Sequence, residues 1–325
     1  MKHYIIISVL FGLVAFAGCS KSNDQDQASG NSQRPKSDDN EKTLVSENPK
    51  GPWGADGQSV LLKAKWIRGK SYVFRQTTDM EMELPIAGPE GSKTKMSMDF
   101  NVDVSDNKGS EKQQMIVQFT KVKMEMSMAG QNMIYDSEDP EKQSALLKTA
   151  FGDFANQKFE AELDKNGNFL NVAENANKQG GAPAVAGIGG LGNEEIANML
   201  KQLGDFGFPD KTVDPATKWQ HGQELSMQQI GKMKMTIDYT YKGPKDHGGK
   251  KLAEIVFQGI ADTDGEGGLV SFKDSKMSGT MLFDPELGTV VQSNSSVDMT
   301  MSVGGELGAE MDTKTNSSYS LISID

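Results

Sequence analysis

The sequence predicts a mainly β protein of the α+β class, with curved antiparallel sheets and two amphipathic helices packed on them. In several segments apolar and polar residues alternate strictly over eight or nine positions, as in Met96–Val104. Such alternation is typical of antiparallel strands with one buried and one solvent-exposed face. Two other segments carry apolar residues at helical spacing. Short sequence motifs from the first part of the chain recur in the second part, so we expect two related β-rich halves.

Residues 1–18 are expected to be a lipoprotein signal peptide. Lys2 and His3 form a short basic start, and an apolar run too short to span a bilayer follows. The segment Phe16-Ala17-Gly18-Cys19 resembles the lipobox of bacterial lipoproteins, in which the cysteine thiol is diacylglyceryl-modified and the signal is cut before it. Cys19 is the single cysteine of the chain. We therefore expect lipidation at Cys19 and attachment to a membrane through that lipid anchor.

Residues 19–57 are predicted to be the lipidated cysteine followed by a disordered polar tether. Ser, Asn, Asp, Gln and Lys dominate this stretch, so it cannot bury enough apolar surface to offset chain entropy. Ser20, rather than Asp, follows Cys19. By its resemblance to enteric lipoproteins, this implies a periplasm-facing protein on the outer membrane more than on the inner one.

The first β-rich half is predicted over residues 58–178. Beyond the alternating segment at 96–104, the stretch from Met115 to Met128 changes phase, with apolar residues on one parity up to Phe119 and on the other from Val122. A slip of one residue predicts a β-bulge or a sharp bend near Thr120. Asn166-Gly167 predicts the turn of a hairpin.

One helix is expected in this half and the other at the start of the second. Asp139-Pro140-Glu141 has the features of a helix start, and apolar residues at helical spacing follow it: Leu147, Ala150, Phe151 and Phe154. Residues 179–192 are predicted to be a Gly-rich flexible loop. The second helix would begin at Asn193, with its apolar face made by Ile196, Met199, Leu200 and Leu203.

The second β-rich half is predicted over residues 193–325. Its alternating segments lie at 233–241 and 297–303, and residues 283–289 predict another hairpin. Trp66-Ile-Arg-Gly69 is similar to Trp219-Gln-His-Gly222, and a long Met-containing alternating segment follows each. This similarity favours an internal duplication.

Charge and composition exclude several classes of function. The chain has 34 Lys and Arg against 45 Asp and Glu, a net charge of −11, so we expect no nucleic-acid partner. One cysteine leaves no intrachain disulfide, and His221 and His247 are the histidines beyond the leader. Known nucleophile, base and metal motifs are absent from the sequence. We therefore expect a non-catalytic protein without a cofactor.

Methionine is unusually frequent, with 19 residues in the chain. Met-X-Met pairs recur, and residues two apart on a strand lie on the same face. Three interpretations remain open: the methionines fill an apolar core, line a groove for an apolar ligand such as a lipid, or bind Cu(I) through soft thioethers. The candidate copper ligands are Met124, Met126 and Met128.

The lipobox, the polar tether and the Met-X-Met strands together resemble an uncharacterised group of Met-rich bacterial lipoproteins of unknown function. The resemblance covers most of residues 60–325 and implies no activity. The expected architecture is also similar to lipoprotein-carrier half-barrels. We therefore expect a membrane-anchored extracytoplasmic lipoprotein that binds an apolar ligand in a Met-lined β groove. The alternatives are a Cu(I)-binding protein and a structural or interaction lipoprotein without a small ligand.

Overall fold

A computed structural model describes most of the chain beyond residue 50. The described residues are 51–83, 91–105, 111–128, 130–152, 158–164, 169–173, 206–227, 231–263, 270–303 and 309–325. Within them twelve strands form one antiparallel sheet, which confirms the predicted mainly β, antiparallel class. The leader, the tether up to residue 50, the loop predicted at 179–192 and the helix predicted from Asn193 lie outside the described residues.

The strands are long, and every pairing between them is antiparallel. The first six are β1 Ser71–Glu83, β2 Ser92–Val104, β3 Gln113–Met128, β4 Gln131–Asp136, β5 Lys158–Leu163 and β6 Phe169–Ala173. The second six are β7 Lys218–Met227, β8 Gly231–His247, β9 Lys250–Thr263, β10 Val270–Asp284, β11 Thr289–Val303 and β12 Ala309–Ile324.

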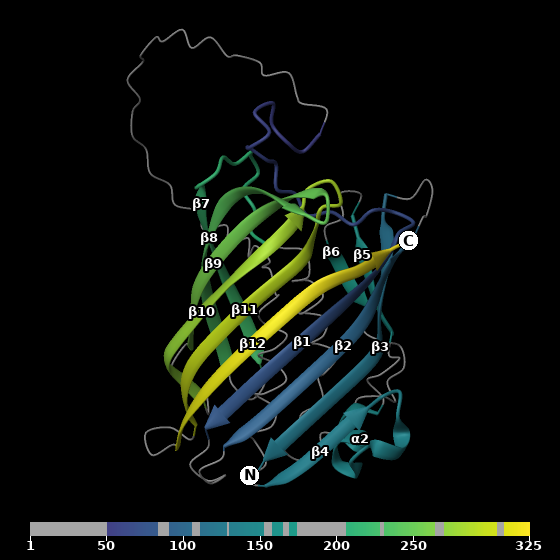
Figure 1. Cartoon of the computed structure of the whole chain (residues 1–325), viewed down its shortest axis with the longest axis vertical. Helices are drawn as coiled ribbons and strands as arrows, with labels where there is room; N and C mark the ends of the chain where they lie inside the picture. The colour runs from purple at the N-terminus through teal and green to yellow at the C-terminus, as the bar shows by residue number, and fades with distance from the viewer. Residues whose placement is uncertain are drawn as a thin grey trace, which may run out of the picture.

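The strands follow one another as a meander that returns to its own beginning. The order across the sheet is β6-β5-β3-β2-β1-β12-β11-β10-β9-β8-β7, with β4 paired to β3 off this path. Strand β12 therefore pairs with β1, and β6 and β7 are the two ends of the described order. Figure 1 shows that the sheet is strongly curved, with the long strands running diagonally across it. Strands from both predicted halves share this one sheet, and their origin by duplication stays a prediction.

The alternation seen in the sequence sorts the side chains onto the two faces of the sheet. In β1 every second residue from Tyr72 to Met82 is buried, while Arg75, Asp79 and Glu81 are exposed. Strands β2 and β3 follow the same pattern. Most of the buried apolar side chains belong to one hydrophobic cluster that extends from β5 to β8. Burial of one face against a charged outer face fixes the register, because a slip of one residue would exchange the two.

The bulge predicted near Thr120 is confirmed. Asp99 of β2 pairs with Lys121, whereas the next residue, Phe100, pairs with Phe119, so Thr120 is the extra residue on β3. Its hydroxyl donates to the Asp99 carbonyl oxygen at 3.2 Å. The extra residue keeps both Phe119 and Val122 on the buried face, and it adds local twist and bend to the sheet.

The prediction of two amphipathic helices packed on the sheet is not borne out. The described residues after Asp139 form a single 3₁₀ turn, Pro140–Lys142, and the seven-residue helix α2, Ala145–Phe151. Tertiary hydrogen bonds prevent one continuous helix, because Ser144 exchanges backbone and side-chain bonds with Ile134 of β4 at 2.7 and 3.0 Å. Gln143 is extended and donates to the Asp136 carbonyl oxygen.

Both predicted hairpins connect neighbouring antiparallel strands. Strands β5 and β6 pair as expected, although the Asn166-Gly167 turn itself lies outside the described residues. Between β10 and β11, the carboxylate of Asp284 accepts the backbone N–H groups of Glu286 and Leu287, each at 3.0 Å. Gly288 closes this turn with a φ of 72°, a conformation that glycine adopts without strain.

The segment of residues 51–70, called here the cap segment, crosses one end of the sheet. Its Gln58 carbonyl oxygen accepts from the Tyr241 hydroxyl at 2.7 Å, and the Lys65 N–H donates to Gly288 at 2.9 Å. Val60 forms a bridge with Val213. The Trp66 ring lies edge-on to Tyr72, with centroids 5.2 Å apart. The cap segment therefore covers the end at which β1 begins and β12 finishes (Figure 1).

The close packing around Gly279, in the middle of β10, can be tested by substitution. A Cβ added there would overlap the Phe257 ring and the Asn294 carbonyl oxygen. We expect Gly279→Ala to lower the free energy of unfolding by about 1–3 kcal/mol, as measured by urea denaturation. Gly222→Ala on β7 is the control, since no atom lies within 4 Å of its added Cβ. Equal effects of the two substitutions would contradict the packing described.

Candidate functional site

The buried face of the sheet is the candidate site, and its side chains change in kind along the strands. Aromatic rings gather toward the cap segment, methionines toward the opposite end, and hydroxyl groups lie between them near the middle of the sheet. The register of β1, β12 and β11 sets this order, because residues directly opposite one another place their side chains on the same face.

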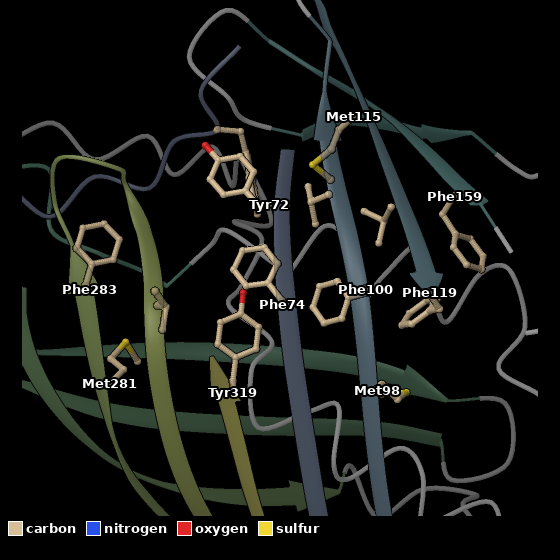
Figure 2. Close-up of a cluster of buried hydrophobic side chains, with 14 of the residues drawn as sticks. Tyr72, Phe74, Met98, Phe100, Met115, Phe119, Phe159, Met281, Phe283 and Tyr319 are labelled. Atoms are coloured by element: carbon tan, nitrogen blue, oxygen red, sulfur yellow. The ribbon is translucent and has the colours of Figure 1, made fainter. Parts of the chain in front are cut away.

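The aromatic cluster extends over five strands. The Phe74 ring lies 5.0 Å from Tyr319 and 5.4 Å from Phe100, between ring centroids, and Phe119 continues the row to Phe159 of β5. Figure 2 shows these rings standing side by side on one face of the strands. Contacts at these distances add to the stabilisation from buried area. This end of the buried face is therefore a packed wall.

Methionines dominate the buried face beyond the aromatic rings. Most are less than one tenth exposed, and they come from strands on both sides of the centre: Met80, Met82, Met96, Met98, Met124, Met126, Met233, Met235, Met277, Met281, Met299, Met301 and Met311. Unbranched thioether side chains adapt to irregular apolar shapes. The predicted Met-lined face is therefore present, formed by flexible side chains rather than by rings.

A set of hydroxyl groups lies between the aromatic and the methionine ends of the buried face, at the centre of the sheet. We call it the hydroxyl band, and its six residues are Thr78 of β1, Thr313, Thr315 and Ser317 of β12, and Ser293 and Ser295 of β11. The register places Ser317 between Thr78 and Ser295, and Thr313 between Met82 and Met299. All six side chains are less than one tenth exposed.

Three members of the hydroxyl band have no hydrogen-bond partner in the described part of the chain. They are Ser295, Thr313 and Thr315, with Thr315 only 2% exposed. In contrast, Thr78 and Ser317 bond to each other, with 3.2 Å between the two hydroxyl oxygens. A buried hydroxyl without a partner costs about 1–3 kcal/mol, so such groups call for an explanation.

The buried face is nearly free of charge. Among the buried residues that the structure describes, the charged ones are Asp99 and Asp284, and neither Lys nor Arg is among them. Asp99 forms a two-point ion pair with Arg75, at 2.7 and 2.8 Å. This bond raises the pKa of Arg75. The Asp284 carboxylate accepts a backbone hydrogen bond from Glu286 within its own turn. The described hydroxyl band thus has no buried cation to neutralise an anion.

Burial also raises the pKa of two tyrosines on this face, Tyr319 and Tyr72. Desolvation raises the pKa of the Tyr319 phenol well above its usual value, since the ring is enclosed. The pKa of Tyr72 is raised for the same reason, and its hydroxyl oxygen accepts the Ile67 N–H at 3.0 Å. These phenols therefore add polar atoms to the cap end without adding charge.

The structure places part of the site predicted from sequence. Met124 and Met126 are buried on β3, and the register sets Met124 opposite Met96 and Met126 opposite Met133. Met128, at the end of β3, is partly exposed. Their role as copper ligands stays a prediction, as does lipidation of Cys19, which lies outside the described residues.

Neither metal-binding clusters of His, Cys, Asp and Glu nor apolar helices of bilayer length occur in the described part of the chain. No group of three or more His, Cys, Asp and Glu side chains is arranged there to hold a metal ion. No described helix has the length and hydropathy needed to cross a bilayer.

The hydroxyl band was missed by the sequence reasoning, although one signal was available. Thr313, Thr315 and Ser317 alternate at the strand period, but Asp312, Lys314 and Asn316 between them are also polar. A segment that is polar on both faces lacks the hydrophobic alternation by which strands are recognised. Only the pairing with β1 and β11 shows which of its faces is buried.

Comparison with known proteins gives a partial family match. Residues 110–178 match a family of unknown function, DUF6263. The match runs from just before β3 to just after β6, about a fifth of the chain. No curated protein matches the sequence.

Solved structures resemble the chain at low identity. A lipovitellin structure described under lipid–protein interactions has a TM-score of 0.42 at 12% identity and covers 80% of this chain, which spans only 26% of that one. A candidate lipoprotein from Parabacteroides distasonis ATCC 8503 has a TM-score of 0.31 at 8% identity, with coverage of 81% and 97%. A candidate exported protein with a YmcC-like fold, from Bacteroides fragilis NCTC 9343, has 0.26 at 8%, with 81% and 99%. Scores below 0.5 assign no function to this chain.

The unpartnered hydroxyls can be tested through stability. We expect Thr315→Val to leave the free energy of unfolding unchanged or to raise it by up to about 1 kcal/mol, because the methyl group replaces a buried hydroxyl without a partner. The matched control is Thr78→Val in the same band, which should lose about 1 kcal/mol by leaving Ser317 unpaired. Both are measured by urea denaturation. A loss at Thr315 equal to that at Thr78 would show a bonded hydroxyl.

Proposed function

We propose that this protein is a non-catalytic, membrane-anchored lipoprotein that binds an apolar ligand such as a lipid on the buried face of its sheet. The observation that carries the proposal is the Met-rich composition of that face, across strands on both sides of β1 and β12. Apolar binding sites in proteins are lined mainly by hydrophobic side chains with a few polar groups. Adaptable methionines suit chains of variable length and unsaturation.

The lipobox supports an extracytoplasmic location for this ligand binding. If Cys19 carries the diacylglyceryl group, the polar stretch between it and the cap segment spaces the folded body from the bilayer. The body would then work within reach of membrane lipids, periplasm-facing and on the outer membrane more than on the inner one. Lipid binding and lipid anchoring would be separate properties, one made by the sheet and one by a single thiol.

Photo-crosslinking in cells tests this proposal. Phe100 faces inward beside Phe74 and Phe119, whereas the next residue, Asn101, lies on the outer face. We expect p-benzoylphenylalanine at position 100 of the full chain to gain discrete lipid masses after irradiation, detected by mass spectrometry of the purified protein. The same amino acid at position 101 is the matched control and should gain few or none.

The result at position 100 decides the proposal. Absence of lipid adducts there, in protein whose thermal unfolding matches wild type, would contradict lipid binding on this face. Adducts of equal yield at both positions would point to non-specific contact with the bilayer. Lipid at position 100 alone would support the proposal directly.

A second candidate function, Cu(I) binding, is favoured by one observation. The register brings Met96 opposite Met124 and Met133 opposite Met126, so four thioether side chains come from three adjacent strands. Thioethers are soft ligands that suit Cu(I). The two candidate functions use neighbouring parts of the same face and can be tested separately.

Competition against a Cu(I) chelator tests this second candidate. We expect the triple variant Met124→Leu, Met126→Leu and Met128→Leu to lose Cu(I) affinity by more than tenfold if these methionines are ligands, because leucine keeps the apolar volume and removes the sulfur. The control is Met277→Leu, Met281→Leu and Met299→Leu on β10 and β11. Unchanged affinity in the first variant would exclude the predicted copper ligands.

A further inference from the structure

We infer that the hydroxyl band selects an uncharged acyl ester, so that the ligand of the buried face is a neutral acylglycerol-type lipid. This inference rests on the proposed function and names its ligand class. In a purely apolar site the central strands would carry apolar residues on the buried face. Strand β12 instead presents Thr313, Thr315 and Ser317 in a row on the buried face.

The unpartnered members of the band indicate a hydrogen-bonded ligand group. Ser295, Thr313 and Thr315 are each more than nine-tenths buried and have no partner among the described residues. They lie on two adjacent strands, where Ser295 is opposite Ser317 and Thr315 is opposite Val297. Their hydroxyls can donate to carbonyl oxygens. An ester group at this level would receive these bonds.

The surroundings of the band divide the ligand into parts. Met80, Met82, Met299 and Met301 extend the apolar face away from the cap segment, and Met277 and Met281 extend it sideways. Acyl chains fit these methionine walls, while the ester carbonyl lies against the band. The aromatic cluster around Phe74, Phe100 and Tyr319 borders the band on its cap side, so an acyl chain can also lie along these rings.

The charge of the headgroup decides which class of acyl lipid fits the hydroxyl band. No Lys or Arg is among the buried residues that the structure describes, so a carboxylate or phosphate held at the band would be buried without a counter-charge. Burying an unpaired anion is strongly unfavourable. The phosphate of a phospholipid is only a few bonds from its esters, and a fatty acid replaces the ester by the charged group itself. An uncharged glyceride avoids both penalties.

Photolabelling in vesicles tests this inference with the full lipidated chain. The protein is reconstituted in phosphatidylcholine vesicles that contain one diazirine-bearing probe at a time: a diacylglycerol, a phosphatidylglycerol, a fatty acid or an alkane. Labelled peptides are mapped by mass spectrometry. We expect the diacylglycerol to label β11 and β12 several-fold more than the two anionic probes do.

The combined variant Thr313→Val, Thr315→Val and Ser295→Ala removes the three unpartnered hydroxyls. We expect it to lower diacylglycerol labelling about tenfold, which corresponds to about 1.4 kcal/mol of binding free energy, and to leave alkane labelling unchanged. The control Thr77→Val removes a hydroxyl that bonds Ser318 away from the buried face and should change neither. Thermal unfolding of each variant shows whether the fold is kept.

The outcomes separate the inference from the proposed function. Labelling of the buried face by no probe would overturn both. In another outcome, the alkane labels the buried face while the combined variant leaves diacylglycerol labelling undiminished. That result would overturn the inference, but the proposed binding of apolar ligands would stand. Stronger labelling by phosphatidylglycerol or the fatty acid would also overturn the inference, because it would require an anion at the band.

Discussion

The pairing of β1 with β12 is the constraint on which the rest of the structure depends. It joins Tyr72 to Ile324 and continues to Glu83 opposite Asp312, interrupted by one bulge near Val73. Without it, the meander would be two separate groups of strands that expose their inner edges. With it, the aromatic row passes from Phe100 through Phe74 to Tyr319. The same pairing sets Thr78 against Ser317 and so builds the hydroxyl band.

The buried face combines two requirements that oppose each other. A stable sheet of this kind needs an apolar face, and the aromatic and methionine side chains meet that need over most of the strands. The centre, however, carries hydroxyls that cost stability when they lack partners. Natural proteins break local rules of this kind mainly where a function requires it. The outer face carries the cross-strand ion pairs instead, such as Glu81–Lys93 at 2.9 Å, where solvent screens them and they contribute little.

The sequence allowed the strands at 96–104, 115–128, 233–241 and 297–303, most of their inward residues and the bulge at Thr120 to be predicted, because burial leaves a period of two in the residue pattern. It could not show that β12 pairs with β1, since no residue pattern in either segment identifies the strand that it pairs with. The helix expected after Asp139 was interrupted by bonds between Ser144 and Ile134, which only the tertiary structure supplies. The hydroxyl band was hidden for a similar reason, since Thr315 and Lys314 are both polar and pairing alone decides which is buried.

The return of the last strand to the first also constrains when folding can finish. Strand β1 has its β2 neighbour early in synthesis, but its other edge waits for β12, about 240 residues further along the chain. Contacts of such long sequence separation form slowly. If the predicted leader directs export through a channel that admits only unfolded chains, a sheet that stays incomplete until β12 is made would keep the chain competent for translocation. The closing pair would then complete the fold only after translocation.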